Sequence, residues 1–296
     1  MGLCALLLWF LADAVGVRAS MEEALALCAR SVIPAMFPFL VASSLLLSLG
    51  FGEWVSPHLA GLMNPLFRLP GAASSALLLG LVGGYPIGAR TTAELYRNGS
   101  LTEDEAERLL AFSNNSNPVF LITVLGAGVF GTLRAGVWLW LIHVGAALLT
   151  GLFFRGKRRG VVRQKAARSP AFLSVPLASA FVEAVKSALS GVLSICAFVV
   201  FFYVLAQPLS HLGGGAGAVL VGATELFSLT PLLTADRFGF VLAAGAAGWG
   251  GVSVLCQTAA VLEGSGLKLR SCVLGKALHG LFSAVLAMAL SGYVLG

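Results

Sequence analysis

Charged residues are scarce in this sequence. They make up 11% of its 296 residues, whereas 58% are hydrophobic and the mean hydropathy is +0.92. Water-soluble domains carry about 25% charged residues, so this composition excludes a soluble globule. It predicts an integral protein of a cell membrane, surrounded by the lipid bilayer, with room for about seven to ten spans of about 20 apolar residues each.

Several chemical signatures are also missing. The five cysteines show no metal-ligand or redox spacing. The sequence has no Gly-rich phosphate loop and no nucleophile paired with a base, and it lacks the residue alternation of a membrane β-barrel. We therefore expect an all-α, polytopic helical bundle that is not an enzyme, with no catalytic residues, no cofactor and no metal.

The net charge of +6 is concentrated in one segment. Seven of the 19 Lys and Arg residues lie in RGKRRGVVRQKAAR, residues 155–168, which holds no acid. Between two hydrophobic halves, such a segment is typical of a cytoplasmic loop rather than of a nucleic-acid-binding patch; a role at anionic lipids is the alternative. It divides the chain into a first membrane half (1–154) that begins with a helix, a basic linker (155–170) and a second membrane half (171–296).

The two halves share one order of features. A shift of 166 residues places Asn64–Leu101 over Thr230–Leu267, so that Gly84 meets Gly250. In each half a long apolar helix is followed by a Pro-marked segment and then by an apolar run that a glycine cluster interrupts. We predict two related repeats, which are inverted if each half crosses the membrane an odd number of times. Gly/Pro-interrupted segments at matching places indicate broken or re-entrant helices around the binding site of a secondary transporter.

The first interruption reads GGYPIGA, residues 83–89, and an arginine follows it. Non-helical backbone in a bilayer must be covered by protein or line a watery cavity. A new half-helix starting near Gly88 would direct unpaired amides at an anion. Arg90 in its first turn is interpreted as a fixed positive charge for a carboxylate or phosphate group. The alternatives are an ion pair with Glu94, at i,i+4, or a side chain that snorkels to the interface.

The second interruption, residues 248–260, carries polar but uncharged side chains: Ser253, Gln257 and Thr258. A buried Gln needs hydrogen-bond partners, so Gln257 binds a ligand, or else a backbone group or a neighbouring helix.

A third polar cluster, Asn114-Asn115-Ser116-Asn117, precedes Pro118. We interpret it as the tip of a re-entrant hairpin that faces a substrate. The alternative is a loop that caps a helix with proline at its first position.

One acid, Glu225, stands alone in the apolar stretch 212–234. Ionisable residues inside a membrane are candidate functional sites, so Glu225 is predicted to carry a coupling proton or cation. The alternative is an internal pairing, for which Lys276 and His279 on one face of the last helix are candidates. His143 is interpreted as a core histidine.

Six segments form a recognisable set: VIPAMFPFLVASSLL (32–46), NPLFRLPG (64–71), GGYPIGAR (83–90), SNNSNPVFLI (113–122), TELF (224–227) and WGGVSVLCQ (249–257). This set resembles the sporulation integral membrane protein family of YlbJ type. That family belongs with the nucleoside-recognition "gate" membrane domains, which are similar to halves of concentrative nucleoside transporters. The resemblance extends from about residue 25 to the end of the chain.

The resemblance implies a multi-pass membrane protein of endospore-forming bacteria that moves dipicolinate, a small aromatic dicarboxylate, across a forespore-related membrane during spore maturation. It implies that Gly84, Tyr85, Pro86, Gly88 and Arg90 form the first break, that Asn114, Asn115 and Pro118 form the hairpin tip, and that Glu225, Gly251, Ser253 and Gln257 line the second half. With the neighbouring polar residues Thr91, Ser116 and Thr258, which the sequence itself adds, the predicted substrate-binding residues are Gly84, Tyr85, Pro86, Gly88, Arg90, Thr91, Asn114, Asn115, Ser116, Ser253, Gln257 and Thr258. Asn117 departs from the family pattern, in which glycine precedes the hairpin proline, and the chain is shorter than the family leads us to expect.

The sequence therefore predicts a transporter of a small anionic metabolite that works by alternating access, driven by a gradient of protons or another cation. Two alternatives stay open, a nucleoside-type carrier and a non-transporting scaffold or regulator of sporulation. The sequence does not decide whether the chain forms a homo-oligomer.

Overall fold

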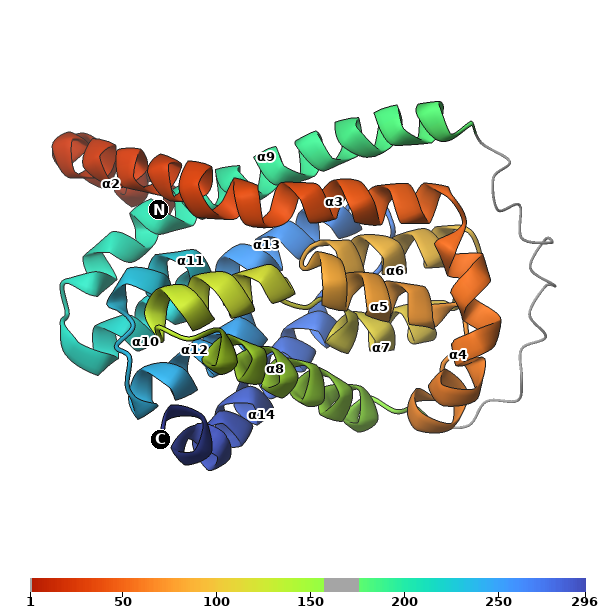
Figure 1. The fold of residues 1–296 in the computed structure, drawn as a ribbon. Coiled ribbons are helices and arrows are strands. Elements are labelled where there is room, and N and C mark those ends of the chain that lie inside the picture. Colours follow the sequence, from red (N-terminus) through yellow and green to blue (C-terminus); the bar gives the residue numbers. More distant parts are fainter. Residues whose placement is uncertain (1, 157–175) are drawn as a thin grey trace.

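The computed structural model describes residues 2–156 and 176–296, and every regular element within those ranges is a helix (Figure 1). The predicted all-α class is confirmed. The first half contains α1 (Gly2–Ala12), α2 (Ala14–Leu27), the π-helix η1 (Cys28–Val32), α3 (Ile33–Ser48), α4 (Phe51–Phe67), α5 (Ala73–Gly83), α6 (Ile87–Arg97), α7 (Glu103–Ser113), the π-helix η2 (Phe120–Val129) and α8 (Leu133–Phe153).

The second half contains α9 (Leu177–Ser210), α10 (Gly214–Thr224), α11 (Leu226–Leu229), the 3-10 turn η3 (Thr230–Leu232), α12 (Arg237–Trp249), α13 (Gly251–Leu262) and α14 (Arg270–Leu295). Most of the predicted basic linker, residues 157–170, lies outside the described residues. At its start, Arg155 Nη2 donates to the carbonyl oxygen of Pro65 at 2.6 Å.

Five described helical stretches are long and apolar enough to cross a membrane: Ala14–Ser48, Leu133–Phe153, Leu177–Ser210, Arg237–Leu262 and Arg270–Leu295. This is fewer than the seven to ten spans expected from composition. The difference arises because α1, α5, η2 and α10 are apolar but only 10 or 11 residues long. Such helices are too short to span a bilayer by themselves.

Small residues set the distance between the long helices. The buried face of α9 begins with Ala180, Ala184 and Ala188 at four-residue spacing and packs along α3, as Figure 1 shows for the two antiparallel rods. A Cβ atom on Gly275 of α14 would overlap the backbone of Ala111 in α7. Lipid provides no hydrophobic force between helices, so close packing of small residues is the main source of their attraction.

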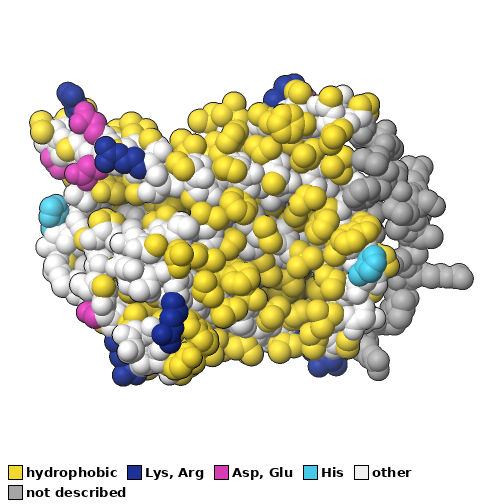
Figure 2. Space-filling view, in the orientation of Figure 1, with side chains coloured by type: hydrophobic (Ala, Val, Ile, Leu, Met, Phe, Trp, Pro, Cys, Tyr) yellow, Lys and Arg dark blue, Asp and Glu magenta, His cyan; other side chains and the backbone are white. Residues whose placement is uncertain are grey.

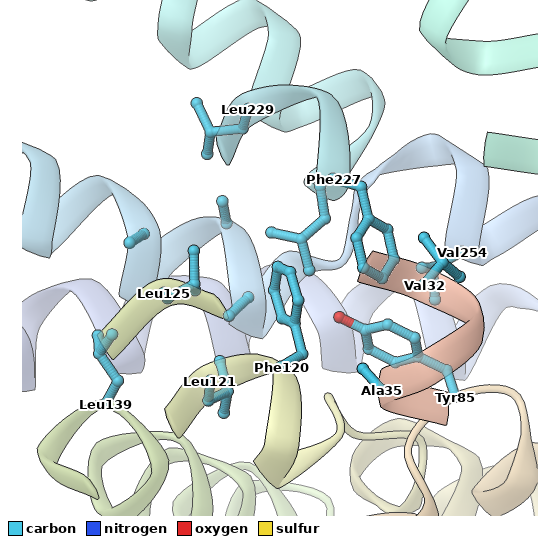
Figure 3. Packing of buried hydrophobic residues seen from close by; sticks show 14 of the residues in the cluster. Val32, Ala35, Tyr85, Phe120, Leu121, Leu125, Leu139, Phe227, Leu229 and Val254 are labelled. Atoms are coloured by element: carbon cyan, nitrogen blue, oxygen red, sulfur yellow. The ribbon is translucent and has the colours of Figure 1, made fainter. Parts of the chain in front are cut away.

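Two clusters of buried apolar side chains fill the interior. The larger joins η1, α3, η2, α8, α9, α10, α12 and α14, and the smaller joins α4 to α7 with α13 and the start of α14. In the larger cluster the rings of Phe120 and Phe227 lie 4.6 Å apart, between their centroids. Figure 3 shows the ring of Tyr85 beside them, with its hydroxyl group directed toward the two phenylalanines.

The face drawn in Figure 2 carries a broad hydrophobic expanse across its middle, and charged side chains lie toward the edges. This distribution fits a protein whose waist is in contact with lipid. At one end, α7 begins with the capping box expected of a solvated helix, because Thr102 Oγ1 accepts from the amide of Glu105, whose carboxylate accepts from the amide of Thr102.

A substitution at Gly80 tests how closely α5 approaches the end of α7. A Cβ atom there would overlap the carbonyl oxygen of Ser113 and lie 3.0 Å from Gly88 Cα. We expect Gly80→Ala to destabilise the protein by about 1–3 kcal/mol through overpacking, measured by equilibrium unfolding in mixed micelles. Gly292→Ala in α14 is the matched control, because its Cβ would meet nothing within 4 Å. A Gly80→Ala protein as stable as the control would contradict this account of the packing.

Candidate functional site

The first predicted break lies between α5 and α6. Gly84 ends α5 with φ of 82°, the Tyr85–Pro86 peptide bond is cis, and α6 starts at Ile87. A Cβ atom on Gly84 would lie 2.8 Å from Asn117 Cβ. Glycine is therefore required here both for its positive φ and for the close approach of the Asn114–Asn117 segment.

The second predicted break lies between α12 and α13, where Gly250 and Gly251 have φ of 83° and 84°. A Cβ atom on Gly250 would lie 3.3 Å from Lys276 Cε, and one on Gly251 would lie 3.1 Å from Glu225 Cα. The two glycines thus bring a buried lysine and a buried acid against the same break.

The Asn114–Asn117 segment is non-helical backbone between α7 and η2, and it is buried. Asn117 acts as the cap that we gave as an alternative: its Oδ1 accepts from the amide of Val119 at 2.7 Å, and its Nδ2 donates to the carbonyl of Gly83 at 3.2 Å. Asn115 Nδ2 donates to the carbonyl of Phe112 at 3.0 Å. The side chain of Asn117 therefore has a structural role: it caps the following helix and binds the end of α5.

Asn114 links the two halves of the chain. Its Nδ2 donates to Thr258 Oγ1 on α13 at 2.9 Å, and that hydroxyl donates to the carbonyl of Val254 at 2.8 Å. Three side-chain atoms of the segment, Asn114 Oδ1, Asn115 Oδ1 and Ser116 Oγ, are buried without a hydrogen-bond partner among the described residues. Buried polar atoms are rarely left in this state in native proteins.

Lys276 of α14 is the charged group at the centre of this cluster, and its residue is 1% exposed. Its Nζ donates to the carbonyl of Asn114 at 3.2 Å and lies 5.0 Å from the centroid of the Tyr85 ring. Within the described ranges no carboxylate lies within 4.0 Å of it. An ammonium group has three N–H donors, so a buried and uncompensated charge keeps donors to spare, an arrangement that is costly for stability.

Glu225 is equally buried and separates α10 from α11 in an extended conformation. Its carboxylate accepts from the amide of Ser228 at 2.6 Å and from Ser228 Oγ at 2.8 Å. The pairing with Lys276 or His279 that we gave as an alternative is absent from the described part of the chain. Glu225 instead caps α11, and its role in coupling stays a prediction.

Two histidines lie beside Lys276, with ring centroids 4.3 Å apart. His143 Nε2 accepts from the amide of Ser116 at 3.0 Å, and His279 Nε2 donates to the carbonyl of His143 at 3.0 Å. Their Nδ1 atoms are both buried without a partner in residues 2–156 and 176–296. His143 is a core residue, as expected, but half of its hydrogen-bonding capacity is unused.

The polar residues of the second break line one face of α13. Gln257 Nε2 donates to Ser253 Oγ at 3.3 Å, and Gln257 Oε1 is buried without a partner in the described structure. The interhelical bond that we considered for Gln257 is therefore replaced by a bond within α13, and one acceptor stays unused.

Arg90 lies apart from this cluster. Its side chain is 46% exposed, its Nε pairs with Glu94 Oε1 at 3.2 Å, and its Nη1 donates to Ser187 Oγ at 2.6 Å. It lines a cleft of ≈ 430 Å³ between α3, α6 and α9, together with Pro86, Thr91, Glu94 and Glu183. The i,i+4 pair that we gave as an alternative is thus present, and the charge of Arg90 is largely balanced by its neighbours.

The structure divides the predicted site residues among several places. Tyr85 and Asn114 contact Lys276, Thr258 binds Asn114, and Ser116 binds the neighbouring His143. Gly84 and Gly88 pack against the ends of the Asn114–Asn117 segment, Ser253 and Gln257 pair on α13, and Arg90, Pro86 and Thr91 line the cleft. Sequence analysis treated Lys276 and His279 only as partners for Glu225 and did not assign them to the site. The signal that could have found them was their i,i+3 spacing in an otherwise apolar helix. The described residues hold no group of three or more metal-ligand side chains.

Comparison with known proteins bears on the same region. A family model described as Gate, nucleoside recognition, matches residues 29–133. The sporulation integral membrane protein YlbJ of Bacillus subtilis (strain 168) is 28% identical over 305 residues, which cover 88% of this chain and 74% of YlbJ. The predicted resemblance is confirmed. The chain is a multi-pass membrane protein that is similar to YlbJ and contains a segment that matches the Gate model.

No solved structure matches the chain. The Gate match contains the first break and the Asn114–Asn117 segment, whereas Glu225, Gln257 and Lys276 lie beyond it.

Thr258→Val tests the link between the two halves. The substitution keeps the shape of the side chain but leaves the Nδ2 donor of Asn114 unpaired, so we expect a loss of about 1–3 kcal/mol in equilibrium unfolding. Thr150→Val is the matched control: Thr150 is also fully buried, and its hydroxyl donates to its own helix, at Ala146. Equal losses in both variants would mean that the Asn114–Thr258 bond adds nothing to stability.

Proposed function

We propose that this protein carries a small organic anion across the membrane. The observation behind this proposal is the buried, uncompensated ammonium group of Lys276, placed where two helix breaks and a non-helical segment meet. A buried cation without a counter-charge is expected to persist only where it has a function. Its most direct use in a Gate-type membrane protein is to bind a negatively charged cargo.

The surroundings of Lys276 suit a carboxylate. The ammonium N–H groups that do not bind Asn114 can donate to it, and so can the hydroxyl groups of Tyr85 and Ser116, for which the described residues provide no hydrogen-bond partner. The ring of Tyr85 provides an aromatic face within reach of the same charge. All of these groups are buried in this conformation, so we infer that the anion enters when the Asn114–Asn117 segment moves.

Two related halves would provide that movement. In support, Gly84 and Gly250 are 166 positions apart, and each ends a short helix with a positive φ. Thr92 and Thr258 are also 166 apart; each donates to the carbonyl four residues earlier, and they contact the adjacent residues Ser113 and Asn114. Figure 1 places α5–α7 toward one end of the bundle and α10–α12 toward the other. We infer inverted repeats that rock about this centre and give alternating access.

Dipicolinate is the cargo that the resemblance to YlbJ-type proteins predicts. Its two carboxylates and its ring match an ammonium beside an aromatic side chain, and it is therefore the first ligand to test. The Gate description, nucleoside recognition, gives the second candidate, a nucleoside, which has no charge to place against Lys276.

Uptake into proteoliposomes tests the proposal. We expect saturable uptake of labelled dipicolinate by the wild type, and at least about a hundredfold loss in Lys276→Met, because removing one partner of a buried charged contact costs about 3 kcal/mol or more. Methionine keeps the length of the apolar stem, and thermal melting checks that the variant folds.

Three other results would change the assignment. Uptake of labelled uridine in place of dipicolinate, unaffected by Lys276→Met, would identify a nucleoside carrier. Dipicolinate uptake that does not depend on Lys276 would remove this site but keep the transporter. A folded wild type that binds and moves neither compound would favour the non-transporting scaffold.

Arg90 is proposed to attract the anion at the cleft before it reaches Lys276. Because Glu94 and Ser187 already bind its guanidinium group, we expect Arg90→Gln to raise the KM for uptake about three- to tenfold, as expected for a screened surface charge, with little change in maximal rate. Arg97→Gln, on the same helix but outside the cleft lining, is the control. A complete loss of uptake in Arg90→Gln would move the binding site to the cleft.

A further inference from the structure

One titratable side chain holds the non-helical segment in place. The amide of Ser116 donates to Nε2 of His143 at 3.0 Å. A ring nitrogen that accepts an N–H bond carries no proton, so His143 is neutral in this conformation, with its proton on Nδ1.

The groups that face His143 are both on α14. They are His279, whose ring centroid lies 4.3 Å away with the two ring planes tilted by 43°, and Lys276 one turn earlier. The other elements packed against α8 bring no charge to this point in the described structure. α7 has its charged residues in its first six positions, η2 has no titratable residue, and Arg237 of α12 donates to the carbonyl of Met288. α4 approaches α8 through Phe67 at Gly151, about two turns beyond His143, and its His58 is hydrogen-bonded to the carbonyl of Trp54.

We propose that His143 is the proton-coupling residue: proton binding at its Nε2 releases the Asn114–Asn117 segment and is linked to binding of the anion at Lys276. The second part of this proposal rests on the proposed anion transport, whereas the first part does not. It assigns to His143 the coupling role that sequence analysis gave to Glu225.

The first part follows from the hydrogen bond itself. Nε2 can hold either a proton or the amide of Ser116, but not both. Once the proton is bound, that amide loses its acceptor and must find another partner, because an unpaired backbone N–H group inside a membrane protein is costly. The same segment contributes the carbonyl of Asn114 that binds Lys276, so its release also frees an N–H group of the lysine.

The second part follows from charge. An imidazolium group on His143 would be a second buried cation beside Lys276, and like charges at short range disfavour each other strongly away from water. A bound anion offsets this repulsion and so favours protonation. By reciprocity, protonation favours anion binding by the same factor. The proton enters from the aqueous side that the site faces and leaves with the anion, so the proton and the anion move in the same direction.

His143 differs from His279 in this respect. Nδ1 of His279 is a free acceptor, while its Nε2 keeps its bond to the carbonyl of His143. Protonation of His279 therefore breaks no hydrogen bond to the Asn114–Asn117 segment and would not release it.

Hydrogen exchange of the peptide spanning residues 112–120 provides the test. Protection of the Ser116 amide is measured by mass spectrometry between pH 5 and pH 8, divided by the intrinsic rate at each pH, without ligand and with saturating dipicolinate. In the wild type without ligand we expect protection to fall about five- to tenfold, the factor that one hydrogen bond is worth, only at the acid end of this range, because the charge of Lys276 opposes protonation. With dipicolinate bound we expect the fall at a higher pH.

Three variants assign the effect to one residue. His143→Gln keeps an acceptor for the Ser116 amide but cannot bind a proton, so protection should become independent of pH. His279→Gln keeps a donor for the His143 carbonyl and should retain the pH dependence. His211→Gln, an exposed residue at the end of α9, should behave as the wild type. Loss of the pH dependence in His279→Gln, with retention in His143→Gln, would overturn the assignment.

The two proposals fail separately. Protection that is flat from pH 5 to pH 8 in the wild type, with and without dipicolinate, overturns the role of His143 whether or not the anion binds. A His143-dependent fall in protection together with no dipicolinate binding by thermal shift keeps the proton switch and removes this anion. Binding of dipicolinate that leaves the pH of the fall unchanged overturns the linkage.

Discussion

The structure depends on how one stretch of buried, non-helical backbone satisfies its hydrogen bonds inside a membrane protein. The segment Asn114–Asn117 has no helix ladder, so each polar group needs a partner from another element. Those partners come from α5, α8, α13 and α14. The close glycine contacts of α5, α6 and α14 allow these helices to approach the segment and the end of α7. The hydrogen bonds of the segment therefore depend on the close packing of the helices around it.

Much of the fold could be predicted from the sequence because its signals are local. Low charge and long apolar runs gave the membrane class, and glycines at positions 84 and 250 marked helix ends that the structure places there. The capping of α7 followed from residue spacing. The number of long spans was overestimated, since hydropathy cannot tell a half-length apolar helix from part of a full one. Whether an apolar helix is half-length depends on where it ends, and the ends of α5 and α10 are set by contacts with other elements.

The candidate site was harder to predict because it depends on contacts between residues far apart in the sequence. Arg90 was conspicuous beside a break, yet the carboxylate of Glu94 pairs with its charge and Ser187 accepts a further hydrogen bond from it. Lys276 was less conspicuous, since nothing in its local sequence tells whether a lysine in an apolar helix reaches the surface or points inward. Its burial follows from the approach of Gly275 to Ala111, a contact that spans more than half of the chain. Glu225 was singled out as the lone acid of an apolar stretch, but the helix-capping bonds to Ser228, three residues on, were overlooked although they are local.

The threonine contacts to the segment have a consequence for leakage. Thr92 reaches Ser113 from the first half and Thr258 holds Asn114 from the second, so adjacent residues are attached to different halves. If the halves rock against each other, the segment can follow one partner only by parting from the other. In the proposed carrier, the barrier toward one compartment would then open only after the segment has exchanged one threonine contact for the other, so a continuous pore between the two sides would not form.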